Sequence, residues 1–234
     1  MNRIEQNRTD VKLKGVFRFS IAFTLAEVLI TLGIIGIVAE MTIPTLTTNY
    51  QKQVAVTQLK QTYSDLANAV KLSEADNGES ASWNFDSGDD IAASHTFYDT
   101  YFKPYLMNAK FCNDGTGDGS CGMTVSGTGV NYMLNNGVGL SMVLKSSGVK
   151  MVYILIDVNN AKKPNVMGKD VFYFTLSPTT GLIPYDYVKG MTRDQAISDP
   201  TFGCVKSGVT YPRYLCTALL MIDSWQMRSD YPWD

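Results

Sequence analysis

Histidine is nearly absent from the chain, which has one such residue, His95, among 234. Catalytic sites that use histidine as a base, and many zinc sites, need this residue beside a partner, and no partner is recognisable in the sequence around His95. The chain also has no GxSxG nucleophile motif, no P-loop, and no GxGxxG fingerprint that joins a predicted strand to a helix. These absences predict that the protein is not an enzyme, and they favour a packing or surface role for His95.

Charge is also scarce, because Lys, Arg, Asp and Glu together make up 18% of the residues and the net charge is −2. Residues 1–22 carry five basic and two acidic side chains, a net charge of +3, so that the rest of the chain is left at −5. A protein that binds nucleic acid needs a positive surface. The sequence therefore predicts no nucleic-acid partner.

One long apolar run lies between Phe23 and Pro44 and reads FTLAEVLITLGIIGIVAEMTIP. As a helix at about 1.5 Å per residue, the part before the proline spans roughly 31 Å, the thickness of a bilayer's hydrocarbon core. The basic leader before it predicts a cytoplasmic N-terminus and an outer location for everything after the run. A secretory signal peptide would have a shorter apolar core and a better cleavage site than residues 39–41 offer. A plain anchor would need neither Glu27 nor Pro44.

This run is similar to the N-terminal segment of type IV pilins and type II secretion pseudopilins. The matching residues are Phe23, Thr24, Leu25, Glu27, the run Val28–Val38, and Pro44. The resemblance implies that a prepilin peptidase cuts between Ala22 and Phe23 and methylates the new amino terminus. Ala22 stands where that family usually has glycine. The resemblance also implies that Glu27, fifth in the mature chain, and Pro44 serve assembly.

The same resemblance implies a location and a set of partners. A pilin-like chain is inserted in the bacterial inner membrane with its N-terminus in the cytoplasm, and it later joins a periplasmic or cell-surface filament. Its partners are other pilin or pseudopilin subunits, the prepilin peptidase, the inner-membrane assembly platform and membrane lipid. Secretion, motility, adhesion and competence all remain open as the task of the machine.

Helical periodicity continues after the apolar run, but it becomes amphipathic, with apolar residues at three- to five-residue steps from Leu46 to Val70. One helix is predicted from about Phe23 to about Asp76, with Asn77-Gly78 as its stop and Pro44 as a bend. The predicted divisions are a leader (1–22), a transmembrane and assembly half of the helix (23–44), an amphipathic half (45–76) and a globular domain (77–234).

The globular domain is predicted to be of the α+β class. Asp89 or Asp90 is a candidate cap for a helix over residues 91–106, and residues 112–129 form a glycine- and cysteine-rich loop. Strand-like runs follow at Val130–Leu134, Val138–Leu144, Lys150–Val158, Val171–Leu176 and Leu182–Tyr187. We expect an antiparallel sheet of about four strands packed on the amphipathic half of the long helix, which the pilin resemblance also implies.

Four cysteines lie in the predicted outer domain, and an even count in an oxidising compartment predicts two disulfides. Three connectivities are open. We prefer Cys112–Cys121 with Cys204–Cys216, because each of these pairs closes a short loop that contains glycine. A zinc site is the alternative, but no CxxC pair supports it.

Asp157, Asn159, Asn160 and Asp170 are the candidates for a bound ion, because carboxylate and amide oxygens suit calcium. Their spacing does not follow the EF-hand pattern, and Asn and Asp are also frequent in tight turns. The turn interpretation is preferred, so no cofactor is expected.

The sequence therefore predicts a structural role, that of a prepilin-like subunit of a type IV pilus or a type II secretion pseudopilus. The alternative is a minor pilin that acts as a surface binding module for adhesion or DNA uptake. An anchored enzyme is a third possibility, which the missing catalytic motifs disfavour.

Overall fold

The computed structural model describes residues 24–114, 129–160 and 162–233. The chain divides into two compact units, Met1–Thr47 and Thr48–Asp234. The helices are α1 (Leu25–Asn77), a 3-10 turn η1 (Ser80–Ser82), α2 (Ile91–Tyr101), α3 (Arg193–Ser198) and α4 (Cys216–Ile222). The strands are β1 (Lys110–Asn113), β2 (Val130–Met133), β3 (Gly139–Lys145), β4 (Met151–Asp157), β5 (Val171–Ser177) and β6 (Gly181–Pro184).

Helix α1 confirms the predicted long helix and ends one residue beyond the expected stop, before Gly78 at φ +79°. The helix continues through Pro44. In the second unit it buries a stripe of side chains at three- and four-residue steps, which is the period of one helical face. This stripe consists of Ala55, Leu59, Thr62, Leu66, Ala69, Val70 and Ser73.

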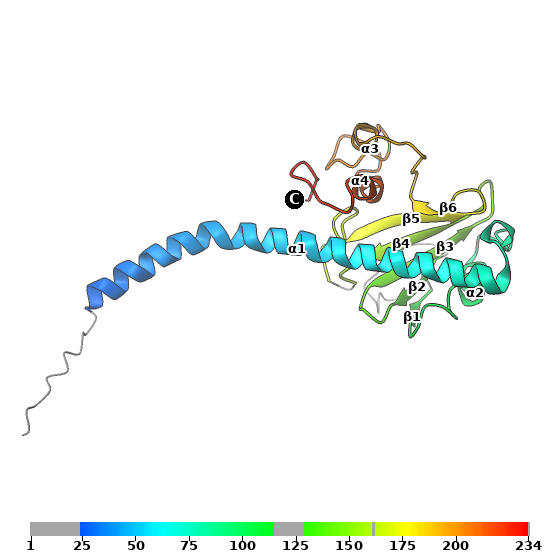
Figure 1. Ribbon diagram of the computed structural model, residues 1–234, viewed down its shortest axis with the longest axis horizontal. Coiled ribbons are helices and arrows are strands. Elements are labelled where there is room, and N and C mark those ends of the chain that lie inside the picture. Colours follow the sequence, from blue (N-terminus) through cyan, green and yellow to red (C-terminus); the bar gives the residue numbers. More distant parts are fainter. Residues whose placement is uncertain (1–23, 115–128, 161, 234) are drawn as a thin grey trace, which may run out of the picture. The chain divides into compact units, whose positions relative to one another are not determined.

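The strands form one six-stranded antiparallel sheet in which each strand pairs with its neighbours in sequence, in the order β1 to β6 (Figure 1). Alternate residues of β4 and β5, such as Ile154 and Phe174, are fully buried and lie opposite each other. The ring of Tyr63 on α1 stacks on that of Phe174 at 5.4 Å between centroids. The core therefore lies between the amphipathic part of α1 and one face of the sheet.

Two details of the predicted domain were wrong. The sheet has six strands where about four were expected, because all five strand-like runs pair in it and β1, which was not predicted, adds a sixth. Helix α2 ends at Tyr101 instead of near Leu106, since Pro104 cannot continue a helix. Its predicted cap is confirmed, because the carboxylate of Asp90 accepts a hydrogen bond from the backbone N–H of Ala93 at 2.7 Å.

Candidate functional site

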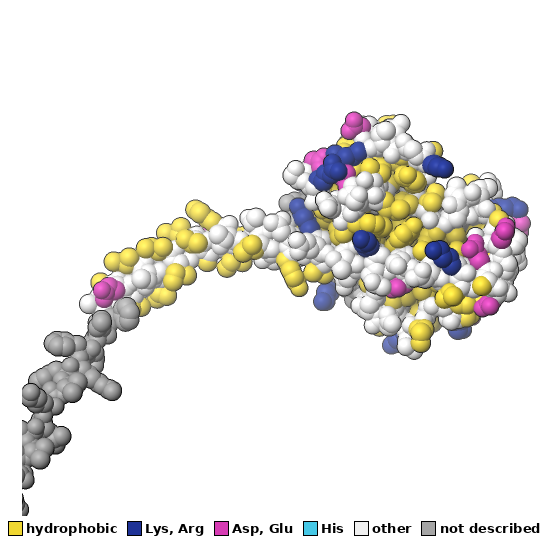
Figure 2. Space-filling view, viewed as in Figure 1, with side chains coloured by type: hydrophobic (Ala, Val, Ile, Leu, Met, Phe, Trp, Pro, Cys, Tyr) yellow, Lys and Arg dark blue, Asp and Glu magenta, His cyan; other side chains and the backbone are white. Residues whose placement is uncertain are grey.

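In the described part of the first unit, α1 exposes an apolar surface to the solvent. Its large apolar side chains are exposed, and the most apolar 18-residue window of α1 has none of its residues buried. By length and composition this helix could cross a membrane. Figure 2 shows apolar side chains along this part of α1. They are Leu25, Val28, Leu29, Ile30, Leu32, Ile34, Ile35, Ile37, Val38, Met41, Ile43 and Leu46.

Glu27 lies in the first turn of α1 and closes a capping box with Thr24. Its carboxylate accepts hydrogen bonds from the backbone N–H and the hydroxyl of Thr24, both at 2.8 Å, and its own N–H donates to the Thr24 hydroxyl at 3.2 Å. The T-x-x-E spacing that produces this box was readable in the sequence and was missed. Glu27 therefore has a local role in starting the helix. Ala22 and Phe23, the predicted cleavage pair, lie outside the described residues.

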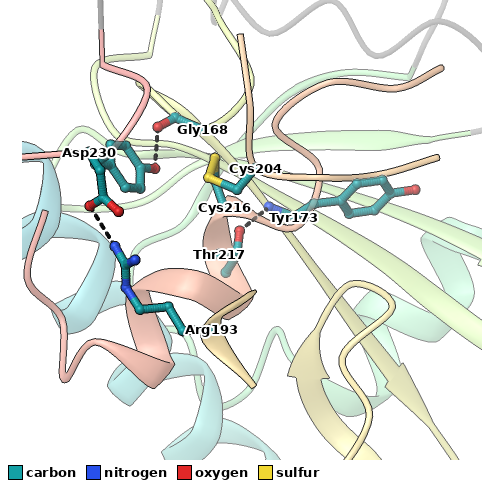
Figure 3. The surroundings of a disulfide bond; sticks show 8 residues. Gly168, Tyr173, Arg193, Cys204, Cys216, Thr217 and Asp230 are labelled. Atoms are coloured by element: carbon teal, nitrogen blue, oxygen red, sulfur yellow. Dashed lines mark hydrogen bonds and ion pairs between the residues drawn. A yellow bond between two sulfur atoms is a disulfide. The ribbon is translucent and has the colours of Figure 1, made fainter. Parts of the chain in front are cut away.

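The Cys204–Cys216 disulfide is confirmed, with the two Cα atoms 4.7 Å apart (Figure 3). It joins the first residue of α4 to the segment after α3. Gly168 packs directly against it, because a Cβ atom built on Gly168 would stand 2.8 Å from Cys216 Sγ. The hydroxyl of Tyr231 donates a hydrogen bond to the carbonyl of Gly168. Cys121 lies outside the described residues, so its pairing with Cys112 stays a prediction.

A cluster of ion pairs holds the C-terminal segment beside the disulfide. The guanidinium of Arg193 lies 3.0 Å from the carboxylate of Asp223 and 2.5 Å from that of Asp230, and Arg228 contacts Asp223 from another side at 3.1 Å. The side chain of Asp223 is 1% exposed, so two guanidinium groups compensate its burial. This cluster is satisfied within the fold and explains why α3 and α4 lie together.

Two buried carboxylates lie at the ends of the connection from β4 to β5, since Asp157 is the last residue of β4 and Asp170 directly precedes β5. The side chain of Asp170 accepts hydrogen bonds from the Nδ2 of Asn159 at 3.0 Å and from the backbone N–H groups of Asn165 and Val166. The Oδ1 of Asp157 accepts from the N–H of Asn159 at 3.1 Å. The four residues singled out from the sequence are therefore brought into one loop.

Three oxygen atoms of this loop are buried and have no hydrogen-bond partner. They are Oδ2 of Asp157, Oδ1 of Asn159 and Oδ1 of Asn160. Asp157 as a whole is fully buried. Burial raises the pKa of Asp157 to about 7, the N–H groups of Asn159 and Asn160 lower it, and the charge of Asp170 adds to the rise. The hydrogen bonds to the carboxylate of Asp157 thus do not offset the cost of burying its charge.

A hollow of about 500 Å³ opens beside this loop, between its lysines and the start of the amphipathic part of α1. Asn159, Asp170 and Trp233 are among its lining residues. The ammonium of Lys169 lies over the ring of Trp233, 5.2 Å from its centroid. Lys162 and Lys163 are exposed. The loop is therefore open to the solvent on one side.

His95, for which a packing or surface role was favoured, is half-buried. It lies on α2 with its Nδ1 3.6 Å from the carboxylate of Asp99, and its ring packs beside Phe111. Within residues 24–114, 129–160 and 162–233, no three His, Cys, Asp or Glu side chains gather as a metal site. The Asp157 loop has two carboxylates, and its other oxygens come from amides.

Comparison with known proteins gives a match to a protein family. A family described as a family of unknown function, DUF6613, matches residues 45–234. The match begins directly after Pro44 and covers the second unit. No curated protein and no solved structure matches the chain.

Proposed function

The chain belongs to the DUF6613 family, a family of unknown function, and we propose that it is a prepilin-like structural subunit of a membrane-anchored filament. In this proposal the protein is inserted in the inner membrane with residues 1–22 in the cytoplasm. It is cleaved before Phe23 and methylated there, and it assembles with other pilin or pseudopilin subunits through the first half of α1. The domain after Thr47 lies on the outer side.

The observation that carries this proposal is the change of surroundings along one continuous helix. The apolar first half of α1 buries no large side chain, whereas the second half contributes Leu59 and Leu66 to the core. An exposed apolar surface of this length needs lipid or other apolar helices around it. A helix that first lies in lipid and later packs among copies of itself would meet that need in both states.

Glu27 is the second support. At the centre of a membrane an ionised residue costs roughly 2.5–3.5 kcal/mol on insertion scales. Glu27 follows Leu25, where α1 begins, and can lie near the headgroups. Among packed helices the same carboxylate would leave water and would need a cation. The new amino group of Phe23 on a neighbouring copy supplies one of the right sign, and pairing the two would fix the axial register of the copies.

Two substitutions separate this register role from the capping box. Glu27→Gln keeps the capping box, since glutamine serves at this position, but it removes the charge. Glu27→Leu removes both. We expect both variants to insert and to be processed, and both to yield few filaments in a sheared-filament assay on the same cells. Glu40→Leu, a second exposed acidic position of the same helix half, is the matched control and should assemble.

The outcomes of this assay are distinct. If Glu27→Gln gives the wild-type yield of filaments and Glu27→Leu gives few, assembly depends on the capping box of Glu27 and not on its charge. If both variants give the wild-type yield of filaments, Glu27 has no role in assembly. No filaments from the wild-type chain would contradict the proposed function itself.

A minor subunit that binds a ligand at the surface is the second candidate. One observation favours it, a hollow of about 510 Å³ lined by Tyr153, Ile183 and Tyr185 on β4, β6 and the turn after β6. Aromatic side chains in a hollow suit flat apolar ligands. The abundance of the chain in sheared filaments discriminates the two, because a major subunit dominates them and a minor one is scarce.

A further inference from the structure

The hollow beside the β4–β5 connection is lined by three lysines, although the chain as a whole is acidic. Lys162, Lys163 and Lys169 lie around it together with one carboxylate, that of Asp170, so the lining has a net charge of +2. Residues 23–234 together carry a net charge of −5. The hollow is therefore a local positive surface on an acidic protein.

The fold does not balance this positive charge. None of the three lysines makes an ion pair within residues 24–114, 129–160 and 162–233. Asp170 is 3% exposed, and its oxygens accept hydrogen bonds from Asn159 and from two backbone N–H groups instead of from a lysine. Lys162 and Lys163 are exposed. Their ammonium groups are thus available to an anionic ligand from outside the domain.

The place of the hollow along the chain indicates what that ligand is. Its other wall is α1, beginning at Tyr50, which follows Pro44 by six residues, or roughly 9 Å of helix rise. The headgroup region of a bilayer extends about 5–8 Å beyond the hydrocarbon core on each side, and electrostatic attraction at physiological salt reaches about 8 Å. Tyr50 is 68% exposed, and tyrosine is enriched at the headgroup level of membrane proteins.

We propose that this hollow binds the phosphate groups of anionic lipids, at the outer surface of the membrane that α1 crosses. The inference rests on the membrane insertion in the proposed function, but it does not depend on filament assembly. Each lysine ammonium has three hydrogen-bond donors and a charge opposite to that of phosphate. The contact holds the second unit at the membrane surface until the chain is assembled.

Acetylation of individual lysines tests the proposal, because a lysine that contacts phosphate reacts more slowly with an amine-directed reagent. The full chain is placed in nanodiscs of phosphatidylcholine, with or without phosphatidylglycerol, and each lysine is followed by peptide mass spectrometry. Lys162 and Lys163 should react about three-fold more slowly in the discs that contain phosphatidylglycerol.

Two other lysines of α1 serve as internal controls. Lys71 is exposed on the same helix but lies 21 residues beyond Tyr50, roughly 30 Å, where salt screens the membrane charge. Its rate should be equal in both kinds of disc. Lys52 is at the level of the hollow but lines a different one. It should slow less than Lys162 and Lys163, and equal slowing of Lys52 would mean a general surface field and would overturn the hollow as the site.

Substitutions at exposed positions give a second measurement. The midpoint of thermal unfolding of the wild-type chain should be about 5 °C higher in the discs with phosphatidylglycerol than in those without it. A double variant, Lys162→Gln with Lys163→Gln, should lose most of this difference. Lys71→Gln is the matched control and should keep the difference in full. A double variant that keeps it as well overturns the proposal.

Inorganic phosphate distinguishes a lipid from a soluble ligand. If phosphate added to phosphatidylcholine discs slows Lys162 and Lys163 as much as phosphatidylglycerol does, the ligand is a soluble phosphate and the lipid proposal is overturned. Equal acetylation rates in all discs overturn it too. A chain that does not enter the discs contradicts membrane insertion, and with it the proposed function on which the inference rests.

Discussion

Asp157 makes the stability of the domain depend on pH. Its pKa is raised from 3.8 to about 7 in the folded chain, chiefly by burial. Between these values the folded state holds a proton that the unfolded chain releases. The free energy of unfolding should therefore fall as the pH rises from about 4 to about 7, by an amount of order a few kcal/mol. Chemical denaturation at a series of pH values across this range measures the change.

The Asp157→Asn variant isolates the effect, because an amide stays neutral throughout. Its free energy of unfolding should fall less steeply than that of the wild type over this range. Asp86→Asn, at an exposed carboxylate paired with Lys150, is the control and should keep the wild-type slope. Equal slopes for Asp157→Asn and the wild type would show that Asp157 titrates normally in the folded chain.

Gly168 is a glycine that the fold requires for two reasons, its backbone conformation and its contact with the disulfide. It has φ +74°, and an added Cβ would stand 2.8 Å from Cys216 Sγ and 3.0 Å from the Cβ of Arg213. Gly168→Ala should therefore lower the free energy of unfolding by about 3 kcal/mol, from overpacking and backbone strain together. Gly190→Ala is the control, since φ is +88° there but nothing lies within 4 Å. Its cost should be about 1 kcal/mol, from the backbone alone.

Denaturant unfolding of both variants separates the two causes. The difference between Gly168→Ala and Gly190→Ala measures the contact with the disulfide. Equal losses would mean that the loop moves away from Cys216 without cost.

At the scale of elements, the sequence was most informative where apolar residues recurred at one regular spacing, either helical or alternating. Helix α1 followed from its apolar run and its amphipathic stripe, and β3, β4 and β5 followed from their apolar alternation and the turns between them. Strand β1 was missed because its four residues carry little pattern and depend on pairing with β2. The end of α2 was misplaced by five residues, although Pro104 already indicated an earlier stop.

The candidate site shows the same limit. The residue types of the Asp157 loop were visible in the sequence, but its unpartnered oxygens depend on burial by segments far away in the chain. Likewise, the contact of Gly168 with Cys216 depends on how α4 docks beside the loop, and no local pattern encodes it. The capping box of Glu27 was the opposite case, since T-x-x-E is a local signal.

At the scale of the molecule, the second unit should fold without the first. The family match begins at residue 45, the second unit begins at Thr48, and the first buried residue of α1 is Ala55. Deleting residues 1–48 removes no core side chain. The product should be a soluble monomer with a cooperative unfolding transition, as judged by sedimentation and circular dichroism. An unfolded or aggregated product would place the boundary elsewhere.

The central claim is that the first half of α1 is a processed assembly helix, and the mass of the mature N-terminus tests it most directly. The chain is purified from membranes and its N-terminal peptide is analysed by mass spectrometry. We predict a chain that begins at Phe23 and carries one methyl group on its amino nitrogen. A chain that begins near Thr42, or one that keeps residues 1–22, would contradict the account.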